Sequence, residues 1–397
     1  MSNDTPPANE KWFQNRWVQM IVGIIITNTF SILTTWLLHA SPPVVPVVPP
    51  DDNKPVIVQT GGRGWINDPD AVAAAIPQIA ASQGMPAEFG QVANALIGAE
   101  DANRSVFFWQ AEEKVLGKVQ PSWDQGPVGT CVSFGWARGC QDLMLLRVAS
   151  GENNEKWPGH TVATEPIYGG SRVEIGGGRI RGDGSVGAWA AQYVQKYGLL
   201  FRQKYSTQPG GAAKYDLTTY SPSLSRSWGK TGVPNDLEPI AKEHPVTAVA
   251  RLANGTELWA ALGSAYPVPV CSDYGFEGNP PPDGIMEPRG QWGHCMLFRG
   301  RFMHATKGKC VVVQNSWDGY IPRITVETTD AGHVELPEGC FAIRLTVADK
   351  MVREGDTFAI SGVQGFPKRK PRDWFTYTAP SRRRELFSDA TVFALGL

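Results

Sequence analysis

Apolar residues recur at helical spacing in four segments in the first half of the chain. The clearest run covers residues 131–146, where Val, Phe, Trp, Ala and Leu return every three or four positions. Residues 188–198 repeat this pattern, and two shorter stretches at 69–81 and 89–97 alternate small apolar and polar residues in the same way. We therefore predict helices at these four places.

The second half of the chain carries a different pattern. Short runs rich in Val and Ile, broken by Gly and Pro, dominate from Pro245 onward and indicate β-strands. The clearest of these runs lie at 246–252 and 310–313. Helices early in the chain followed by strands are typical of an α+β fold.

An uncharged stretch at 17–38 is long enough to cross a membrane. At about 1.5 Å per residue, a helix of its 22 residues spans a hydrocarbon core about 30 Å thick. Trp residues lie near its ends, and Lys11 and Arg16 precede it. We expect a single-pass membrane anchor, with residues 1–16 cytoplasmic and the rest of the protein on the extracytoplasmic side. A cleaved signal peptide ending near Ala40 and a buried core helix are the alternatives.

Further segments divide the chain after this stretch. Residues 41–60 begin as a Pro-rich run that favours extended polyproline geometry and predicts a semi-rigid linker. Residues 61–118 hold the two short predicted helices, and their position is compatible with a removable propeptide or with a plain packing element. We place the main domain at 119–363. The tail at 364–397 is basic and aromatic, and it could contact anionic lipid or a partner, or form a solvated extension.

Length and charge narrow the possible functions. A chain of 397 residues fits one enzyme domain with accessory segments. The formal net charge of −1 gives no basic footprint, so we expect no nucleic-acid partner. The His residues have no ligand-like spacing, so we expect no metal site and no cofactor.

Six cysteines in a chain of this length do not form the dense pattern of a disulfide scaffold. Five of them lie in apolar runs, where cysteine behaves as a small hydrophobe. We expect these five in the core: Cys140, Cys271, Cys295, Cys310 and Cys340.

Four polar side chains in three segments carry the chemistry of nucleophilic catalysis. Cys131 follows Gln125 by six residues in a Gly-rich turn and starts the helical run at 131–146, so the positive end of a helix would lower the pKa of its thiol. His294 would take the thiol proton and later protonate the leaving group, while Asn315 would hold one tautomer of the ring. The Gln125 amide and the Cys131 backbone N–H could donate to an oxyanion. Taken singly, Cys131 would be interpreted as a small buried hydrophobe, His294 as a core histidine and Asn315 as a turn residue.

These segments, taken together and in this order, resemble the papain-like cysteine peptidases. The family carries an oxyanion glutamine and the nucleophile in a Gln-Gly-x-x-Gly-x-Cys stretch, which is matched here by residues 125–131. Its histidine lies on a later apolar strand, matched by His294, and an Asn-Ser-Trp follows, matched by residues 315–317. The resemblance implies Gln125, Cys131, His294 and Asn315 as catalytic residues, with Trp317 shielding the bond between histidine and asparagine.

Weaker matches extend the resemblance over residues 119–347. Asp183, Gly184 and Ser185 stand where the family has an Asn-Gly-Gly that lines the substrate cleft. Residues 267–270 resemble the strand that opens the second lobe, and residues 339–343 resemble its closing strand. The implied fold has two lobes, a helical lobe that carries Cys131 and a β-barrel-like lobe that carries His294.

The sequence also departs from the family pattern. Val132 replaces the usual Trp after the nucleophile, Val128 replaces a disulfide Cys, and Gly293 replaces a polar residue before the histidine. These changes leave the chemistry possible but bear on substrate preference and efficiency.

The resulting prediction is a membrane-tethered cysteine endopeptidase that acts on peptides or proteins. Two alternatives stay open. One is a catalytically silent papain-fold component that binds or assembles on a membrane or a virus-like particle. The other is an acyl transferase, in which an amine replaces water as the second nucleophile.

Overall fold

The computed structural model describes residues 57–58, 64–97, 103–152, 155–206 and 210–367. The expected membrane span at 17–38, most of the Pro-rich segment and the tail beyond residue 367 lie outside the described residues. Within the described ranges, no helix is both long enough and apolar enough to cross a membrane.

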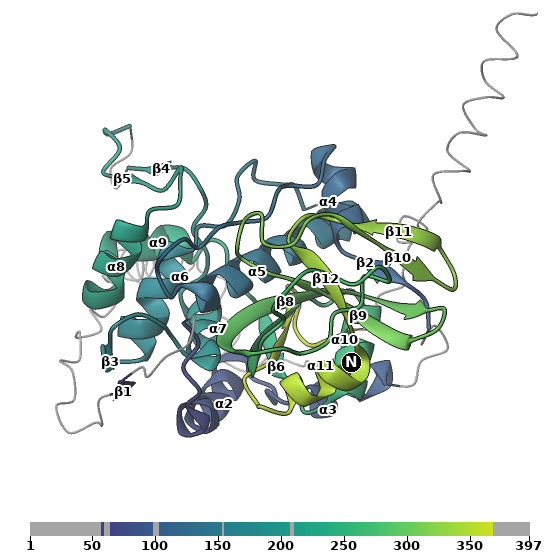
Figure 1. Ribbon diagram of the computed structural model, residues 1–397. Coiled ribbons are helices and arrows are strands. Elements are labelled where there is room, and N and C mark those ends of the chain that lie inside the picture. Colours follow the sequence, from purple (N-terminus) through teal and green to yellow (C-terminus); the bar gives the residue numbers. More distant parts are fainter. Residues whose placement is uncertain (1–56, 59–63, 98–102, 153–154, 207–209, 368–397) are drawn as a thin grey trace, which may run out of the picture. The chain divides into compact units, whose positions relative to one another are not determined.

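The first half of the main domain is helical and is organised around α5 (Cys131–Ser150). This helix confirms the one predicted at 131–146, and α7 (Gly187–Lys196) confirms the one predicted at 188–198. Figure 1 shows α5 running between this group of helices and the sheet. The other helices of this part are α6 (Glu165–Gly170), which continues into a π-helical turn (Ser171–Ile175), α8 (Pro222–Thr231) and α9 (Glu238–Ala241).

Most of the second half forms a seven-stranded sheet centred on β8 (Gln291–His304). β8 pairs antiparallel with β7 (Val268–Tyr274), β9 (Gly308–Gln314), β10 (Ile324–Thr328) and β2 (Val106–Phe107). The strand order is β11-β10-β8-β9-β12, with β2 and β7 also on β8. β11 is Gly332–Leu336 and β12 is Cys340–Arg344. The strands predicted around 267–270, 310–313 and 339–343 are confirmed, and the α+β class with them.

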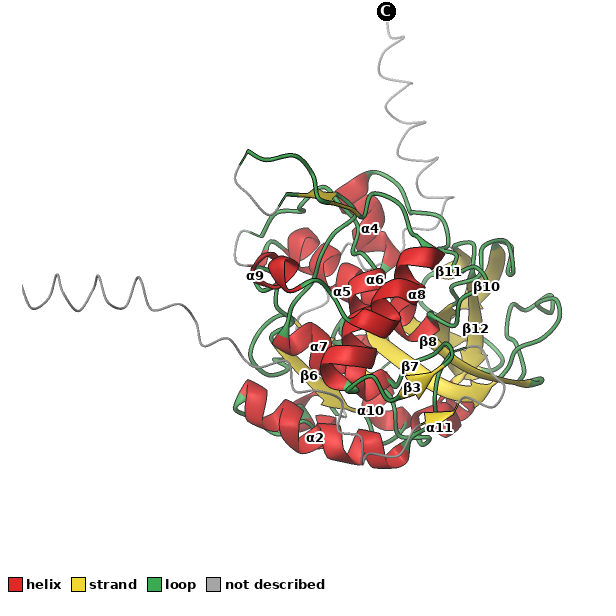
Figure 2. Cartoon of the chain, turned by 90° about the vertical axis from the view of Figure 1, so that its left-hand side faces the viewer, coloured by secondary structure: helices red, strands yellow, loops and turns green. Residues whose placement is uncertain are grey.

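The short helices expected before the main domain are also present. α2 (Pro69–Gln83) packs against α7, as Figure 2 shows, and α3 (Phe89–Val92) leads into a 3₁₀ turn at Asn94–Leu96. α4 (Trp109–Leu116) packs against α5. Because β2 and α4 join the sheet and the helical part directly, residues 106–116 belong to the packed body.

Further short elements complete the described chain. They are β1 (Ile57–Val58), β3 (Ile180–Arg181), β4 (Lys204–Tyr205), β5 (Tyr215–Asp216), a 3₁₀ turn (Asn235–Leu237), β6 (Ala248–Arg251), α10 (Gly255–Gly263), α11 (Leu345–Val352) and β13 (Phe358–Ser361). β6 confirms the strand predicted at 246–252 and pairs antiparallel with β13.

Two glycines let α5 lie close against the sheet. A Cβ atom added to Gly135 would lie 2.9 Å from the Cys295 sulfur, and one added to Gly139 would lie 2.9 Å from a methyl carbon of Ile360. Contacts this short leave no room for a side chain at either position. The beginning of α5, and with it Cys131, is therefore held close to the segment of β8 that carries His294.

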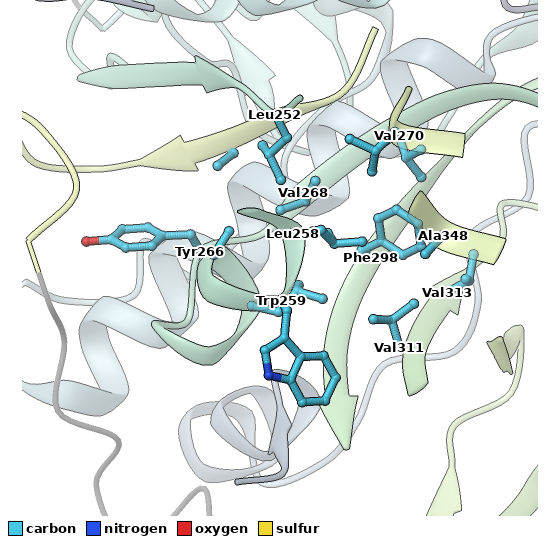
Figure 3. Packing of buried hydrophobic residues seen from close by; sticks show 14 of the residues in the cluster. Leu252, Leu258, Trp259, Tyr266, Val268, Val270, Phe298, Val311, Val313 and Ala348 are labelled. Atoms are coloured by element: carbon cyan, nitrogen blue, oxygen red, sulfur yellow. The ribbon is translucent and has the colours of Figure 1, made fainter. Parts of the chain in front are cut away.

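A hydrophobic core fills the space between the sheet and its covering helices. Figure 3 shows one part of it, in which Leu258 and Trp259 of α10 face Phe298, Val311 and Val313 of the sheet. A second cluster on the helical side includes Trp136 of α5, Trp189 of α7 and Val72 and Ile79 of α2. All six cysteines are buried and none forms a disulfide, which confirms the core positions expected for five of them.

A buried charge network ties α4, α5 and β8 together. Arg299 Nη2 lies 3.1 Å from Glu112 and 3.0 Å from Asp142, and Arg138 lies 2.6 Å from Glu112. Burial raises the pKa of Asp142, although both arginines oppose the rise. Burial also disfavours the charge on Arg299, but the carboxylates of Asp142 and Glu112 together raise its pKa. The mutual pairing offsets part of the cost of burying these charged groups.

Candidate active site

The Gly-rich turn before α5 delivers Cys131 to the first position of the helix. Thr130 is the N-cap residue, and Ser133 Oγ donates to the Thr130 carbonyl at 2.8 Å. Tyr220, two residues before α8, stabilises the turn through two hydrogen bonds. Its hydroxyl donates to the Gln125 carbonyl at 3.0 Å and lies 3.0 Å from Thr130 Oγ1. The expected position of Cys131 at the positive end of a helix is confirmed.

His294 and Asn315 are brought together by the pairing of β8 with β9. His294 Nε2 lies 2.8 Å from Asn315 Oδ1, and both side chains are buried. Asn315 Oδ1 also accepts the backbone N–H of Ser316 at 2.7 Å, which identifies this atom as the amide oxygen. Because an amide oxygen only accepts, Nε2 carries a proton and Nδ1 is the basic nitrogen of the neutral ring.

Trp317 covers the bond between His294 and Asn315. Its ring stacks on the imidazole with centroids 4.3 Å apart and planes inclined by 28°. Trp292 adds an edge-on contact to Trp317 at 4.7 Å between centroids. This aromatic surround limits the access of water to the hydrogen bond.

The Cys131 sulfur lies against the strand that carries His294. The backbone N–H of Cys295, the next residue after His294, donates to Cys131 Sγ at 3.3 Å. The thiol is fully buried. Burial raises the pKa of Cys131 well above its usual range, the neighbouring Cys295 thiol adds to the rise, and backbone hydrogen bonds from Cys295 and Val132 oppose it. The lowered pKa expected at a helix N-terminus is therefore not found, because the loss of water outweighs the helix.

Gln125 connects the turn to the segment after Asn315. Its backbone N–H donates to the Ser316 carbonyl at 3.0 Å, and its side-chain oxygen accepts from Ser316 Oγ at 2.8 Å. The side-chain nitrogen, the expected oxyanion donor, donates to the Val128 carbonyl at 3.0 Å. Gln125 thus lies beside Cys131 with its amide held within the same turn.

The segment of Asp183, Gly184 and Ser185 lies against the turn that precedes Cys131. Asp183 Oδ2 accepts the backbone N–H of Gly129 at 3.3 Å, which joins this segment to the turn before Cys131. The Tyr168 hydroxyl accepts the N–H of Gly184 at 3.1 Å, and the buried Arg172 donates to the Gly184 carbonyl. Hydrogen bonds and ring contacts thus link the segments that carry the eight residues singled out from the sequence.

Residues 64–66 cover this site. The Trp65 backbone N–H donates to the Gly293 carbonyl at 2.8 Å, directly before His294. Ser185 N–H donates to the Gly64 carbonyl at 2.8 Å, and the N–H of Ile66 donates to the Ser185 carbonyl at 2.9 Å, so the segment pairs with Ser185 as a parallel strand does. We call residues 64–66 the cover.

The cover lies directly against the turn before Cys131. A Cβ atom added to Gly64 would lie 2.4 Å from the Gly129 carbonyl oxygen, and the φ angle of Gly64 is +124°. Only glycine meets both conditions. The cover also anchors its central side chain, because Trp65 Nε1 donates to Asp356 Oδ2 at 2.8 Å.

Sequence reasoning missed several residues that shape the site. Tyr168, Arg172 and Tyr220 hold its two loops, and Trp65 and Asp356 fix the cover. The only sequence signal available for the cover is the run Gly61-Gly62-Arg63-Gly64 before Trp65, which is compatible with an unusual backbone but does not say what the segment touches. In the described part of the chain, no group of three or more His, Cys, Asp or Glu side chains is arranged to hold a metal ion.

No family model and no curated protein sequence matches the chain. Solved structures with a similar chain path include xylellain, a cysteine protease from Xylella fastidiosa, at 15% identity and a TM-score of 0.42, covering 78% of this chain and 96% of xylellain. Procathepsin L 3 of Tenebrio molitor larval midgut matches at 15% identity and a TM-score of 0.39, covering 74% of this chain and 89% of its own. Bromelain from Ananas comosus matches at 16% identity and a TM-score of 0.34, covering 65% of this chain and 98% of bromelain. Similarity at this level assigns no residue roles.

Proposed function

We propose that this protein is a cysteine peptidase that hydrolyses peptide bonds through Cys131, His294 and Asn315. The observation that carries the proposal is the buried pair of His294 and Asn315, whose Nε2 and Oδ1 atoms lie 2.8 Å apart. His294 lies on β8, and the backbone N–H of the next residue, Cys295, donates to the Cys131 sulfur. The tautomer fixed by Asn315 leaves Nδ1 as the base, which is the state that a general base needs.

The reaction proceeds in two halves. His294 Nδ1 takes the proton of Cys131, and the thiolate attacks the carbonyl carbon of the scissile peptide bond. The tetrahedral intermediate collapses to a thioester, and the amine leaves with the proton from His294. Water then attacks the thioester, giving up a proton through His294, and the carboxylic acid and the free thiol are released.

Gln125 and the backbone N–H of Cys131 are the proposed oxyanion donors. The Gln125 amide nitrogen donates to Val128 in the covered state, so it must turn toward the substrate carbonyl to serve this role. The hydrogen bond from Ser316 Oγ would hold the side-chain oxygen of Gln125 in place while the amide nitrogen rotates toward the substrate.

The proposed enzyme is inactive while the cover is in place. The cover uses the backbone groups of Ser185 and Gly293 that a substrate strand would use, and it buries the thiol that must ionise. Activity requires that residues 64–66 leave. Because β2 and α4 are built into the sheet and the charge network, we propose that release involves the chain before α2 and not the whole stretch 61–118.

Labelling with an epoxide-type thiol inactivator, followed by peptide mapping, tests the proposal. Once residues 64–66 have been released, we expect modification confined to Cys131 and loss of peptide cleavage in parallel. Cys131→Ser should abolish both, whereas Cys140→Ser, which alters another buried thiol of the same helix, should retain both. Cleavage that survives in Cys131→Ser would refute the assignment.

The covered site also favours one alternative, a catalytically silent binding or assembly component. A fully buried thiol with a raised pKa is the state expected of a structural cysteine. If Cys131 resists the inactivator even after proteolytic removal of residues 1–66, the silent role is correct. Product analysis with an added amine distinguishes hydrolysis from acyl transfer.

We also propose that residues 17–38 tether the enzyme to a membrane, with the catalytic domain on the extracytoplasmic side. The length and lack of charge of the stretch support this proposal. Resistance of the full chain to extraction from membranes at alkaline pH would be expected. A chain lacking residues 1–40 should be released, and release of both forms alike would contradict the tether.

A further inference from the structure

Three cysteine thiols lie together beside the candidate active site. Cys131 begins α5, Cys295 follows His294 on β8, and Cys271 lies on the neighbouring strand β7. All three are fully buried free thiols of one hydrophobic cluster. The proposed peptidase chemistry uses the Cys131 sulfur only, so it gives the other two thiols no role.

Cys295 and Cys271 face each other across the pairing of β8 with β7, as direct partners in its register. The backbone N–H of Cys295 donates to Cys131 Sγ at 3.3 Å, away from β7. The backbone N–H of Cys271 donates to the Asp356 carbonyl at 3.2 Å, away from β8. The two cysteines therefore form a non-hydrogen-bonded pair, in which Cα atoms lie about 4.5 Å apart and side chains are closest. This separation falls within the range of about 4.4–6.8 Å that a disulfide requires.

The Cys295 thiol also lies against the turn of α5 that follows Cys131. A Cβ atom added to Gly135 would lie 2.9 Å from Cys295 Sγ. Gly135 is four residues after Cys131, so the two share one face of the helix. Burial raises the pKa of both Cys131 and Cys271, and the Cys295 thiol raises each of them further. Cys295 is thus the common neighbour of the other two thiols.

We propose that Cys295 and Cys271 form a disulfide that restores Cys131 after its oxidation by a peroxide. A thiolate that meets a peroxide becomes a sulfenic acid, and a sulfenic acid beside a second thiol condenses with it to a disulfide. Cys295 is placed to condense first, because it adjoins Cys131, and Cys271 is placed to complete the relay. The inference rests on the reactivity of Cys131 proposed for the uncovered site, and it assigns a second reaction to that site.

The relay has three steps. The Cys131 thiolate attacks hydrogen peroxide, the O–O bond breaks, and the leaving hydroxide takes a proton from His294 to form water, which leaves a sulfenic acid on Cys131. The Cys295 sulfur attacks the sulfenic sulfur, an S–S bond replaces the S–O bond, and the hydroxyl leaves as water with the Cys295 thiol proton. The Cys271 sulfur then attacks the Cys295 sulfur and expels the Cys131 thiolate, while the Cys271 proton passes to His294. Overall the peroxide gains two electrons from Cys271 and Cys295, and Cys131 returns unchanged.

The last exchange favours the disulfide between Cys271 and Cys295. A thiol with a lower pKa leaves faster, and the helix N-terminus and His294 stabilise the thiolate of Cys131 once water is readmitted. The strand pair also meets the geometry of a disulfide without movement of the backbone. The nucleophile is therefore the sulfur that is set free.

One equivalent of hydrogen peroxide, added to the reduced full chain with the cover released, tests the relay. Peptide mapping without reductant should find Cys271 linked to Cys295, and Cys131 should stay open to alkylation. Cys271→Ser should stop at a disulfide between Cys131 and Cys295, so peptide cleavage is lost and returns with dithiothreitol.

Two further variants sharpen the test. Cys295→Ala has no thiol beside Cys131, so Cys131 should accumulate as a sulfenic acid that dimedone traps. Its labelling by dimedone should exceed that of the unmodified chain about tenfold or more. Cys310→Ser removes a buried free thiol of another hydrophobic cluster, and this matched control should behave as the unmodified chain does.

A peptide map of the oxidised unmodified chain that lacks the link between Cys271 and Cys295 overturns the inference. The same link formed at the same rate in Cys131→Ser would also overturn it, because the pair would then be oxidised without the nucleophile. Peptide cleavage by the reduced chain is measured separately. Normal cleavage without the link refutes only the relay, whereas the link without any cleavage supports the relay and refutes the peptidase.

Discussion

Shortening Trp65 should expose Cys131 without unfolding the protein. Trp65→Ala removes a buried indole and its hydrogen bond to Asp356, while the three backbone hydrogen bonds of the cover stay possible. Truncation of a buried Trp costs about 3–5 kcal/mol. We take the lower end, because the backbone hydrogen bonds of the cover are retained. A loss of about 3 kcal/mol raises the fraction of molecules with an open cover roughly 10²-fold.

The assay is the rate of alkylation of each cysteine by iodoacetamide in the native protein, followed by mass spectrometry. Cys131 should react about 10²-fold faster in Trp65→Ala than in the unmodified chain. Cys140, buried in the same helix, is the internal reference and should not change. Trp259→Ala is the matched control, since Trp259 is 4% exposed but belongs to the other core cluster.

If Cys131 reacts as slowly in Trp65→Ala as in the unmodified chain, the cover is not what protects the thiol. If Cys131 and Cys140 accelerate together, the substitution has caused global unfolding and the cover has no separate role. An equal acceleration of Cys131 in Trp259→Ala would show that any destabilisation of the fold has the same effect.

Three other predictions concern stability and catalysis. Arg299→Met should lower the free energy of unfolding by about 3–5 kcal/mol in urea denaturation, because Glu112 and Asp142 stay buried with only Arg138 to pair with them. A change below about 1 kcal/mol would contradict a stabilising role of the buried charge network. Burial raises the pKa of Asp356 from 3.8 to about 6, so the folded state binds a proton at this carboxylate more tightly than the unfolded state does. The contribution of Asp356 to stability should therefore improve as the pH falls from about 6 to about 4. Urea titrations at both pH values should show this gain, of about 3 kcal/mol at most, and Asp356→Asn should lack it; an equal pH dependence in both proteins would refute the assignment. Asn315→Ala should reduce kcat about tenfold to a hundredfold, since it frees the ring to adopt the wrong tautomer, and it should shift the acid limb of the pH–rate profile; an unchanged profile would reduce Asn315 to a packing role.

The covered state and the proposed activity are compatible because they need different surroundings for one thiol. While residues 64–66 are in place, burial raises the pKa of Cys131 and the sulfur stays protonated. Removal of the cover would readmit water, and the helix N-terminus and His294 would then act on an accessible thiol in the direction that favours the thiolate.

The local elements of this protein could be predicted from the sequence alone. Helical spacing at 131–146 and the Val-rich run at 310–313 gave α5 and β9, because side-chain periodicity is a property of neighbouring residues. The motif around Cys131 and the order of His294 and Asn315 gave the candidate site, since each residue sits in a short stretch with its own character.

Only the tertiary structure decided what surrounds these residues. Trp65 and Asp356 are 291 positions apart, and Arg299 is 187 positions from Glu112, so no local pattern could have paired them. The direction of the Cys131 pKa also depended on the fold, because the sequence specifies a helix N-terminus but not the loss of water imposed by a distant segment. Chain periodicity determines which face of an element is apolar, whereas burial and pairing depend on which elements that face finally meets.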